Sequence, residues 1–217
     1  KWYENEVKKA GLDIRFNTEV TDLGTLGGFD AYIVATGSVV RTMPNIPGFE
    51  KCLTFTQLLR EKYPVGDKVV FFGGGQSACE AAYEMVLQGK HPIIVEYAKD
   101  LVPAQNVCLS NASFLRDVLE YHKVPTYLEH TIKEIKDKTV VIASKDGKNV
   151  FEVEYDNIVN GIGFVPAPVG GKGKNIHRVG DCVTIGNLRT VIWRAWDVCM
   201  YINGNNQGIE NIIDKFI

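Results

Sequence analysis

Short apolar runs alternate with helical patterns through the middle of the chain, which is typical of a parallel sheet covered by helices. The runs at 68–72 and 92–96 are continuous and bounded by turn signals, as buried strands are. Between them, residues 76–88 place alanine, methionine and valine at helical spacing. The same patterns predict, further along, a helix over 111–122 and strands at 124–128, 131–135 and 156–160. We therefore expect an α/β, Rossmann-like unit in the centre of the chain.

A small antiparallel β segment is expected within this unit. The β-rich runs 139–143 and 150–153 flank Lys145–Lys148, whose Asp-Gly pair favours a tight hairpin turn. Outside the central unit the elements are shorter. The patterns predict a helix over 1–10, strands at 12–16, 29–35 and 176–179, a loop over 164–176 and a helix over 187–202.

The strongest chemical signal is the Gly-rich turn between the first two central strands. Gly73-Gly74-Gly75-Gln76-Ser77-Ala78 matches G-x-G-x-x-A and joins a predicted strand to a predicted helix. In this motif Gly73 allows the tight turn, Gly75 lets a pyrophosphate approach the backbone, and Ala78 lets the helix pack closely on the strand. The N–H groups and dipole at the start of the helix then favour phosphate. The alternative is a Gly-rich turn that binds no ligand.

Glu96 ends the second central strand, about 20 residues beyond the turn, where an acid accepts hydrogen bonds from the adenosine ribose. A 2′-phosphate at that position meets a carboxylate and is repelled. Tyr97-Ala98-Lys99 adds one lysine and no arginine, so NADH is the expected ligand in preference to NADPH. The alternative is a Glu96 side chain that faces solvent at a strand end.

Composition narrows the function classes. The 217 residues carry a formal net charge of −2 and contain no long basic run, so nothing points to nucleic acid or to an anionic membrane. No apolar stretch approaches the ~20 residues of a membrane span, and the first residues do not form a secretory signal. Five scattered cysteines indicate reduced thiols in a cytoplasmic protein and disfavour a zinc site, a redox dithiol or an iron–sulfur cluster; they are Cys52, Cys79, Cys108, Cys182 and Cys199.

Three weaker motifs surround the Gly-rich turn in a characteristic order. Ala35-Thr36-Gly37 precedes it, Gly163-Phe164-Val165-Pro166 follows it, and Gly180-Asp181 comes last. This order resembles the pyridine-nucleotide-dependent flavoprotein family, in which an NAD(P)-binding domain is inserted into an FAD-binding domain. The resemblance implies that Asp181 contacts the ribityl chain of FAD. It also implies that the helix beginning near Asn187 points its N-terminus at the flavin ring.

A more specific resemblance is to the C-terminal half of old-yellow-enzyme-like NADH:flavin oxidoreductases such as 2,4-dienoyl-CoA reductase and 2-enoate reductase. The segments that carry it are 9–20, 179–183 and 191–195. It implies FMN, and an iron–sulfur cluster where one is present, in an N-terminal barrel of the same polypeptide. It also implies reduction of an activated C=C bond.

The chain departs from this family at its beginning. A βαβ unit takes at least ~30 residues, and the 34 residues before Ala35 contain no G-x-G-x-x-G turn for the FAD pyrophosphate. We therefore expect a C-terminal fragment with a partial FAD-binding domain. The expected domains are 1–63 (first part of the FAD domain), 64–165 (NAD(P) domain) and 166–217 (return segment of the FAD domain). A homo-oligomer is compatible with the sequence.

Two functions remain open. The first is a fragment of a redox enzyme in which NADH delivers hydride to FAD. The second is a regulatory module that senses NADH without turnover. A thioredoxin- or glutathione-reductase-like enzyme is disfavoured, because no cysteine pair adjoins either nucleotide-binding motif.

Overall fold

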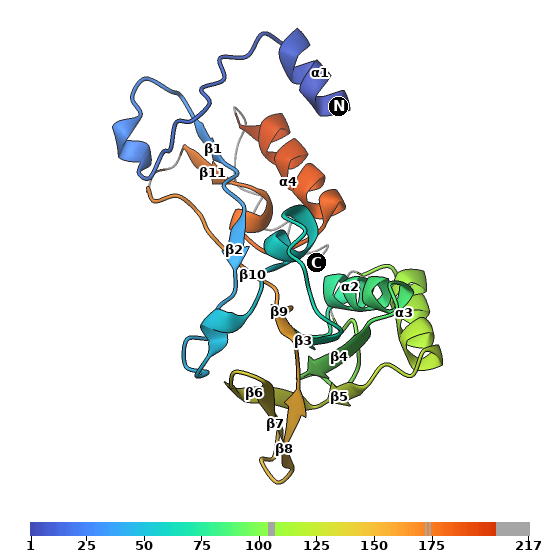
Figure 1. Ribbon diagram of the computed structural model, residues 1–217. Helices are drawn as coiled ribbons and strands as arrows, with labels where there is room; N and C mark the ends of the chain where they lie inside the picture. The colour runs from blue at the N-terminus through green and yellow to red at the C-terminus, as the bar shows by residue number, and fades with distance from the viewer. Residues whose placement is uncertain (104–106, 172, 174, 203–217) are drawn as a thin grey trace. The chain divides into compact units, whose positions relative to one another are not determined.

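The computed structural model describes residues 1–103, 107–171, 173 and 175–202 (Figure 1). Contacts divide the chain into a first unit, Lys1–Ser38 with the described residues from Pro166 on, and a second unit, Val39–Val165. The chain passes from one to the other within β2 (Ser38–Val40) and β10 (Phe164–Pro166), two strands that pair with each other. The expected loop over 164–176 thus begins with a short strand.

The second unit is built on a parallel sheet of four strands. These are β3 (Lys68–Phe72), β4 (His91–Glu96), β5 (Thr126–Leu128) and β9 (Asn157–Asn160), in the spatial order β5-β4-β3-β9. In chain order this is 3-2-1-4, which matches the first four strands of the Rossmann order 3-2-1-4-5-6. The direction of the strand order changes between β3 and β9, and sheets of this kind bind ligands at the carboxyl ends of the strands next to such a point.

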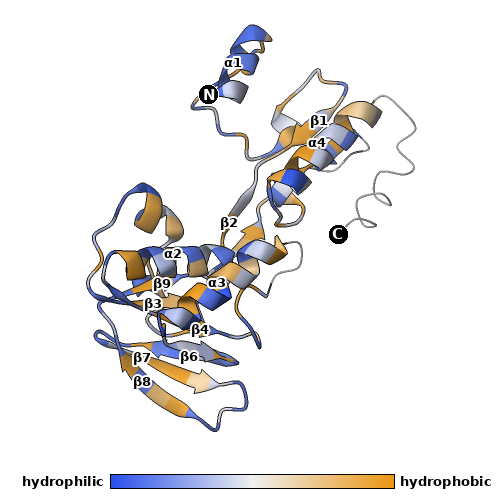
Figure 2. Cartoon of the chain, turned by 90° about the vertical axis from the view of Figure 1, so that its right-hand side faces the viewer, coloured by the Kyte–Doolittle hydropathy of each residue, from blue (hydrophilic) through white to orange (hydrophobic). Residues whose placement is uncertain are grey.

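Two helices cover one face of the sheet. α2 (Gln76–Leu87) and α3 (Leu109–Tyr121) lie side by side (Figure 1), and hydropathy colouring shows the apolar strands beneath them (Figure 2). Because successive side chains of a strand point to opposite faces, Val69 and Phe71 lie in the core that the helices share. The helices therefore form where the sequence predicted them.

A second sheet covers the other face. β6 (His130–Ile135), β7 (Thr139–Ser144) and β8 (Val150–Glu154) pair antiparallel, and the predicted Asp-Gly hairpin joins the last two. Val70 and Phe72 contribute to this second core, together with apolar residues of the antiparallel strands. The unit thus has three layers, and its central sheet is apolar on both faces, as the continuous runs predicted.

Residues 39–63, which the sequence grouped with residues 1–38, make their contacts within the second unit. Leu53 donates its N–H to the carbonyl of Ile158 at 2.8 Å, which adds the segment to the edge of β9. At Gly48, where φ is +81°, an added Cβ would lie 2.0 Å from the carbonyl oxygen of Ile135. Only glycine fits there, so the connection rests directly on β6.

The first unit contains little regular structure among the described residues. β1 (Tyr32–Val34) pairs in parallel with β11 (Ile176–Arg178), and two helices, α1 (Trp2–Lys9) and α4 (Leu188–Tyr201), belong to the same unit. The strand predicted at 12–16 is wrong. Alternation fixes which side chains share a face, but a strand also needs a hydrogen-bonding partner. No described strand pairs with this segment, and its apolar side chains are exposed.

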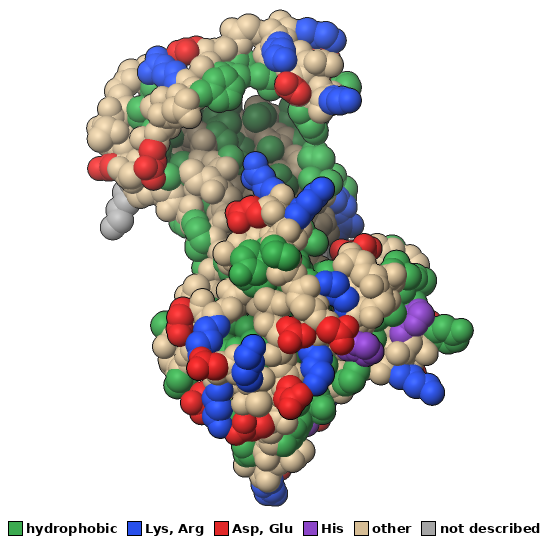
Figure 3. Space-filling view, viewed as in Figure 1, with side chains coloured by type: hydrophobic (Ala, Val, Ile, Leu, Met, Phe, Trp, Pro, Cys, Tyr) green, Lys and Arg blue, Asp and Glu red, His purple; other side chains and the backbone are tan. Residues whose placement is uncertain are grey.

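The two units differ in what they expose. On the face of the second unit shown in Figure 3, basic and acidic side chains are interspersed. The ion pairs of this unit include Lys51–Asp137 and Lys68–Glu154. Both units expose some large apolar side chains, and the first unit does so over much of its described length, with Phe16 80%, Leu188 81% and Trp196 65% exposed. Its described residues therefore leave much apolar surface uncovered.

The five cysteines are all unpaired; Cys79 and Cys182 are buried, Cys52 is half-buried, and Cys108 and Cys199 are exposed. Burial raises the pKa of the Cys52 and Cys79 thiols to about 12. Cys108 is exposed, and hydrogen bonds from the Ser110 hydroxyl and from nearby backbone N–H groups lower its pKa. Only the thiolate is a nucleophile, so reactivity follows both exposure and pKa.

We predict that iodoacetamide at about pH 8 modifies Cys108 first, because a thiol with a pKa near 12 is ionised in only about one molecule in ten thousand at that pH. Cys52 and Cys79 stay unmodified over the same time in the folded protein. Peptide mass spectrometry after timed quenching measures this, and the unfolded protein in denaturant provides the control, in which the cysteines react at similar rates. Equal labelling of Cys79 and Cys108 in the folded protein would contradict the packing described.

Candidate functional site

The Gly-rich turn lies at the carboxyl end of β3, beside the end of β9. Gly73 has φ of +110°, and a Cβ at this position would lie 2.4 Å from the carbonyl oxygen of Gly161. Gly161 is equally confined, because its Cβ would lie 3.0 Å from the carbonyl oxygen of Phe72 and 3.1 Å from the Ala78 Cβ. Small residues at these positions thus let two strand ends and the first turn of α2 meet.

The open side of the turn is at Gly75, the N-cap of α2. Its φ is −68°, and an added Cβ there would have no atom within 4 Å. No described side chain caps the helix, so the first N–H groups of α2 have no side-chain acceptor. Gln76 is half-buried and donates to Glu80, while Ser77 is exposed. The arrangement offers backbone donors and the positive end of the helix dipole to an anion.

Glu96 lies at the carboxyl end of β4 and is only 9% exposed. Its Oε2 accepts a hydrogen bond from the N–H of Gly74 at 2.5 Å, and its Oε1 accepts one from the N–H of Ala98 at 2.6 Å. The alternative in which this side chain faces solvent is therefore wrong. The carboxylate lies against the Gly-rich turn, at its expected place next to the strand end.

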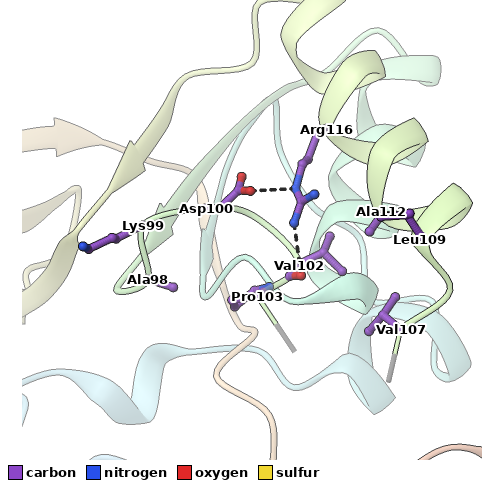
Figure 4. Close-up of a pocket in the computed structure, with 9 residues that line it drawn as sticks. All are labelled: Ala98, Lys99, Asp100, Val102, Pro103, Val107, Leu109, Ala112 and Arg116. Atoms are coloured by element: carbon purple, nitrogen blue, oxygen red, sulfur yellow. Dashed lines mark hydrogen bonds and ion pairs between the residues drawn. The ribbon is translucent and has the colours of Figure 1, made fainter. Parts of the chain in front are cut away.

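A cavity of about 400 Å³ adjoins this strand end (Figure 4). It is lined by Ala98, Lys99, Asp100, Val102, Pro103, Val107, Leu109, Ala112 and Arg116. The Arg116 guanidinium forms an ion pair with Asp100 at 3.1 Å and donates two hydrogen bonds to the carbonyl of Leu101, at 2.8 and 3.0 Å. Lys99 points away from this pair (Figure 4).

The fold thus brings to the site a cation that the sequence analysis missed, because Arg116 lies far along the chain on α3. Its charge is already matched by Asp100 and the loop carbonyls. A second cation, Lys145 of the hairpin turn, has its Nζ 4.1 Å from the centroid of the Tyr97 ring. Arg116 and Lys145 thus both interact with neighbouring groups of the protein, Asp100 and the Tyr97 ring respectively.

The other predicted residues meet in the first unit. Ala35-Thr36-Gly37 follows β1 and Gly180-Asp181 follows β11, so both lie at the carboxyl edge of the same parallel pair. The Thr36 hydroxyl donates to the carbonyl of Ala167 at 2.7 Å, which ties this segment to the residue after β10. Asp181 accepts a hydrogen bond from the N–H of Gly186 at 3.1 Å through Oδ1. Gly163, at φ +93°, belongs instead to the second unit.

Two features around Asp181 were not anticipated. Arg194 of α4 is 4% exposed and donates to the carbonyls of Gly180 and Thr184 at 3.3 and 2.8 Å, which holds the turn against the helix. The first turn of α4 is closed by a capping box between Asn187 and Thr190. The N–H of Thr190 is one of the helix groups that the resemblance directs at the flavin, and it already donates to the Asn187 side chain.

Over the described ranges, no group of three or more His, Cys, Asp or Glu side chains is placed to hold a metal ion. Within the same residues, no helix has the length and apolar character needed to cross a membrane.

Comparison with known proteins agrees with this geometry. The family model of pyridine nucleotide-disulphide oxidoreductases matches residues 24–202. Cinnamate reductase of Clostridium sporogenes is 29% identical over 209 residues, which are 93% of this chain and 31% of the reductase. Dihydrolipoyl dehydrogenase of Corynebacterium glutamicum is 26% identical over 69% of this chain and 32% of that enzyme.

Among solved structures, a complex of 2-naphthoyl-CoA reductase with 2-naphthoyl-CoA superposes with a TM-score of 0.71 at 26% identity, covering 90% of this chain and 30% of the reductase. The thioredoxin reductase of T. acidophilum shares the fold, with a TM-score of 0.58 at 17% identity over 80% of this chain and 64% of that chain. The chain spans about a third of the length of both curated relatives. With the family model covering most of its length, the chain belongs to the pyridine nucleotide-disulphide oxidoreductases, which confirms the family expected from the sequence.

Proposed function

We propose that the chain is the pyridine-nucleotide- and FAD-binding part of a flavin-dependent reductase that takes its electrons from NADH. The observation that carries the proposal is the Gly73–Ala78 turn at the carboxyl edge of a 3-2-1-4 parallel sheet, with Glu96 beside it. NADH supplies hydride and FAD accepts it; the protein binds and orients the two.

The second unit supplies the contacts proposed for NADH. The pyrophosphate lies in the open space at Gly75, where the N–H groups at the start of α2 face it. The adenosine ribose donates to the remaining lone pairs of the Glu96 carboxylate. Because Arg116 is paired with Asp100, no arginine of the cavity wall is presented to a 2′-phosphate.

The first unit supplies the contacts proposed for FAD. Asp181 retains Oδ2 as an acceptor for the ribityl hydroxyls, and the buried Arg194 holds the Gly180 turn in place. Ala35, Thr36 and Gly37 line the same edge of the parallel pair. We propose that these residues form part of an FAD-binding domain.

The relatives suggest the reaction of the longer protein. Cinnamate reductase and 2-naphthoyl-CoA reductase are named for substrates with conjugated unsaturation next to a carboxylate or a thioester. We therefore extend the proposal to an NADH-dependent reduction of an activated C=C bond, of the enoate or dienoyl-CoA type. The electrons would pass to FMN in an N-terminal barrel of the same polypeptide, where an iron–sulfur cluster would also lie. Location in the cytoplasm and the oligomeric state stay predictions.

The second candidate is an NADH-sensing module without turnover. It is favoured by one observation: the second unit by itself contains every contact proposed for NADH, from Gly73 to Glu96. Binding in that unit does not require a flavin in the other. The two candidates differ in whether hydride leaves the nicotinamide.

We expect the flavin-loaded protein to lose its yellow colour when NADH is added without oxygen, because hydride transfer reduces the flavin. Visible absorption in an anaerobic cuvette measures this. The control is the same protein mixed with NAD⁺, which leaves the spectrum unchanged. A protein that binds NADH but never bleaches bound flavin would favour the sensing module instead.

Replacing Gly75 by valine should abolish NADH binding, because the branched side chain fills the space where the pyrophosphate lies. The unfolding temperature should change little, since φ at Gly75 is −68° and the new Cβ meets no atom within 4 Å. Titration calorimetry and a thermal melt measure the two effects. Gly27→Val is the matched control, because Gly27 also has open space around its Cβ but belongs to the first unit. Normal NADH binding by Gly75→Val would reduce the motif to a turn.

NADH should bind at least about tenfold more tightly than NADPH, a difference of about 1.4 kcal/mol, because the Glu96 carboxylate repels a 2′-phosphate. Fluorescence titration with both nucleotides at one ionic strength measures the ratio. Equal affinities, or tighter binding of NADPH, would remove the role assigned to Glu96 in cofactor choice.

A further inference from the structure

The backbone of Gly74, in the middle of the Gly-rich turn, is held on both sides of its Cα. Its N–H donates to Glu96 Oε2 at 2.5 Å. Its carbonyl oxygen accepts from the N–H of Val102 at 2.7 Å and from the Cys79 thiol at 3.3 Å. Gly74 itself is buried. The position of this residue, and with it the orientation of the turn, is therefore fixed by partners on β4, α2 and the loop after β4.

Glu96 makes the link between the turn and the strand end. Its second oxygen accepts from the N–H of Ala98, so one carboxylate satisfies two backbone donors on separate segments. Burial to 9% exposure removes most of the water that would replace these bonds. The methylene groups of the Glu96 side chain also leave little room for a side chain at position 74, since a Cβ on Gly74 would lie 3.1 Å from the Glu96 Cβ.

We propose that Glu96 is a positioning residue for the Gly-rich turn, in addition to being the ribose acceptor; this rests on the proposed NADH site. By holding the Gly74 N–H, the carboxylate orients the turn so that the donors at the start of α2 face the pyrophosphate. A carboxylate has about four lone-pair sites. The two that bind Gly74 and Ala98 leave two for the 2′- and 3′-hydroxyls of the ribose.

Cofactor choice follows from the same bonds. A free carboxylate can rotate away from a 2′-phosphate, but this one cannot do so without leaving the buried N–H of Gly74 and the half-buried N–H of Ala98 without their acceptor. Substitution of Glu96 therefore weakens the phosphate site itself. Glu96→Arg should lower affinity for NADH without creating a site for NADPH.

The test separates ribose recognition from positioning by using ligands with and without ribose hydroxyls. ADP carries adenine, the diphosphate and both ribose hydroxyls. The analogue 2′,3′-dideoxyadenosine 5′-diphosphate keeps the adenine and the diphosphate but lacks the two hydroxyls. Glu96→Gln keeps one acceptor oxygen but turns an N–H₂ group toward a backbone N–H. We expect this variant to lose roughly tenfold or more in affinity for both ligands in titration calorimetry, as an unpaired buried donor requires.

Glu84→Gln is the matched control, since Glu84 is exposed on α2 and the substitution removes the same charge from the same unit. It should bind both ligands as the wild type does. A Glu96→Gln variant that loses affinity for ADP alone, and binds the dideoxy ligand normally, would overturn the positioning role while leaving the ribose role intact. If the wild-type chain binds neither ligand, the proposed function itself fails.

Amide hydrogen exchange of the ligand-free wild-type protein provides a second measurement that needs neither a variant nor a nucleotide. The Gly74 and Ala98 amides should exchange much more slowly than the amide of Ser77, which is exposed at the start of α2. Exchange of Gly74 at the rate of Ser77 would contradict the proposal, whatever the binding results.

Discussion

The structure of the second unit depends on one close approach, between the ends of β3 and β9. The Gly73 Cα lies so near Gly161 that a Cβ would be 2.4 Å from its carbonyl oxygen. A Cβ on Gly161 would in turn lie 3.1 Å from the Ala78 Cβ at the start of α2. Three small residues at one point let the first strand, the last strand and the helix converge. Any larger side chain would push α2 away from the sheet. The uncapped N-terminus of the helix would then no longer sit at the carboxyl edge, where the ligand crevice of such sheets opens.

Much of this unit follows from the sequence because its determinants are local. Continuous apolar runs predicted β3 and β4, and Gly73–Ala78 predicted the turn and the helix that follows it. Gly161 was part of a weak motif but was not expected to pack against the turn. That role arises from a contact with Gly73, 88 residues away in the sequence, which forms only in the folded sheet. Arg116 was missed for the same reason. Its partners, Asp100 and Leu101, come close only when α3 packs beside α2.

The first unit shows the opposite case. Leu12, Ile14 and Phe16 alternate as a strand does, yet they form none, because alternation specifies a face and the described residues supply no strand to pair with. A parallel pair as small as β1–β11 is marginal by itself. Its local order instead relies on particular side chains, such as the buried Arg194 that binds two carbonyls and the Thr36 hydroxyl that binds Ala167. Such long-range polar contacts leave no periodic signal in a sequence.

Glu96 illustrates how one residue can serve structure and recognition at once. The sequence placed a carboxylate at the strand end but could not reveal that backbone N–H groups occupy part of it. Leaving a buried donor without a partner costs about 1–3 kcal/mol, comparable to the ~1.4 kcal/mol that separates two cofactors by tenfold in affinity. The structural bonds are therefore strong enough to hold the charge in place against a 2′-phosphate. Discrimination at this site depends on the rigidity of the carboxylate as well as on its charge, and the Gly74 peptide provides that rigidity.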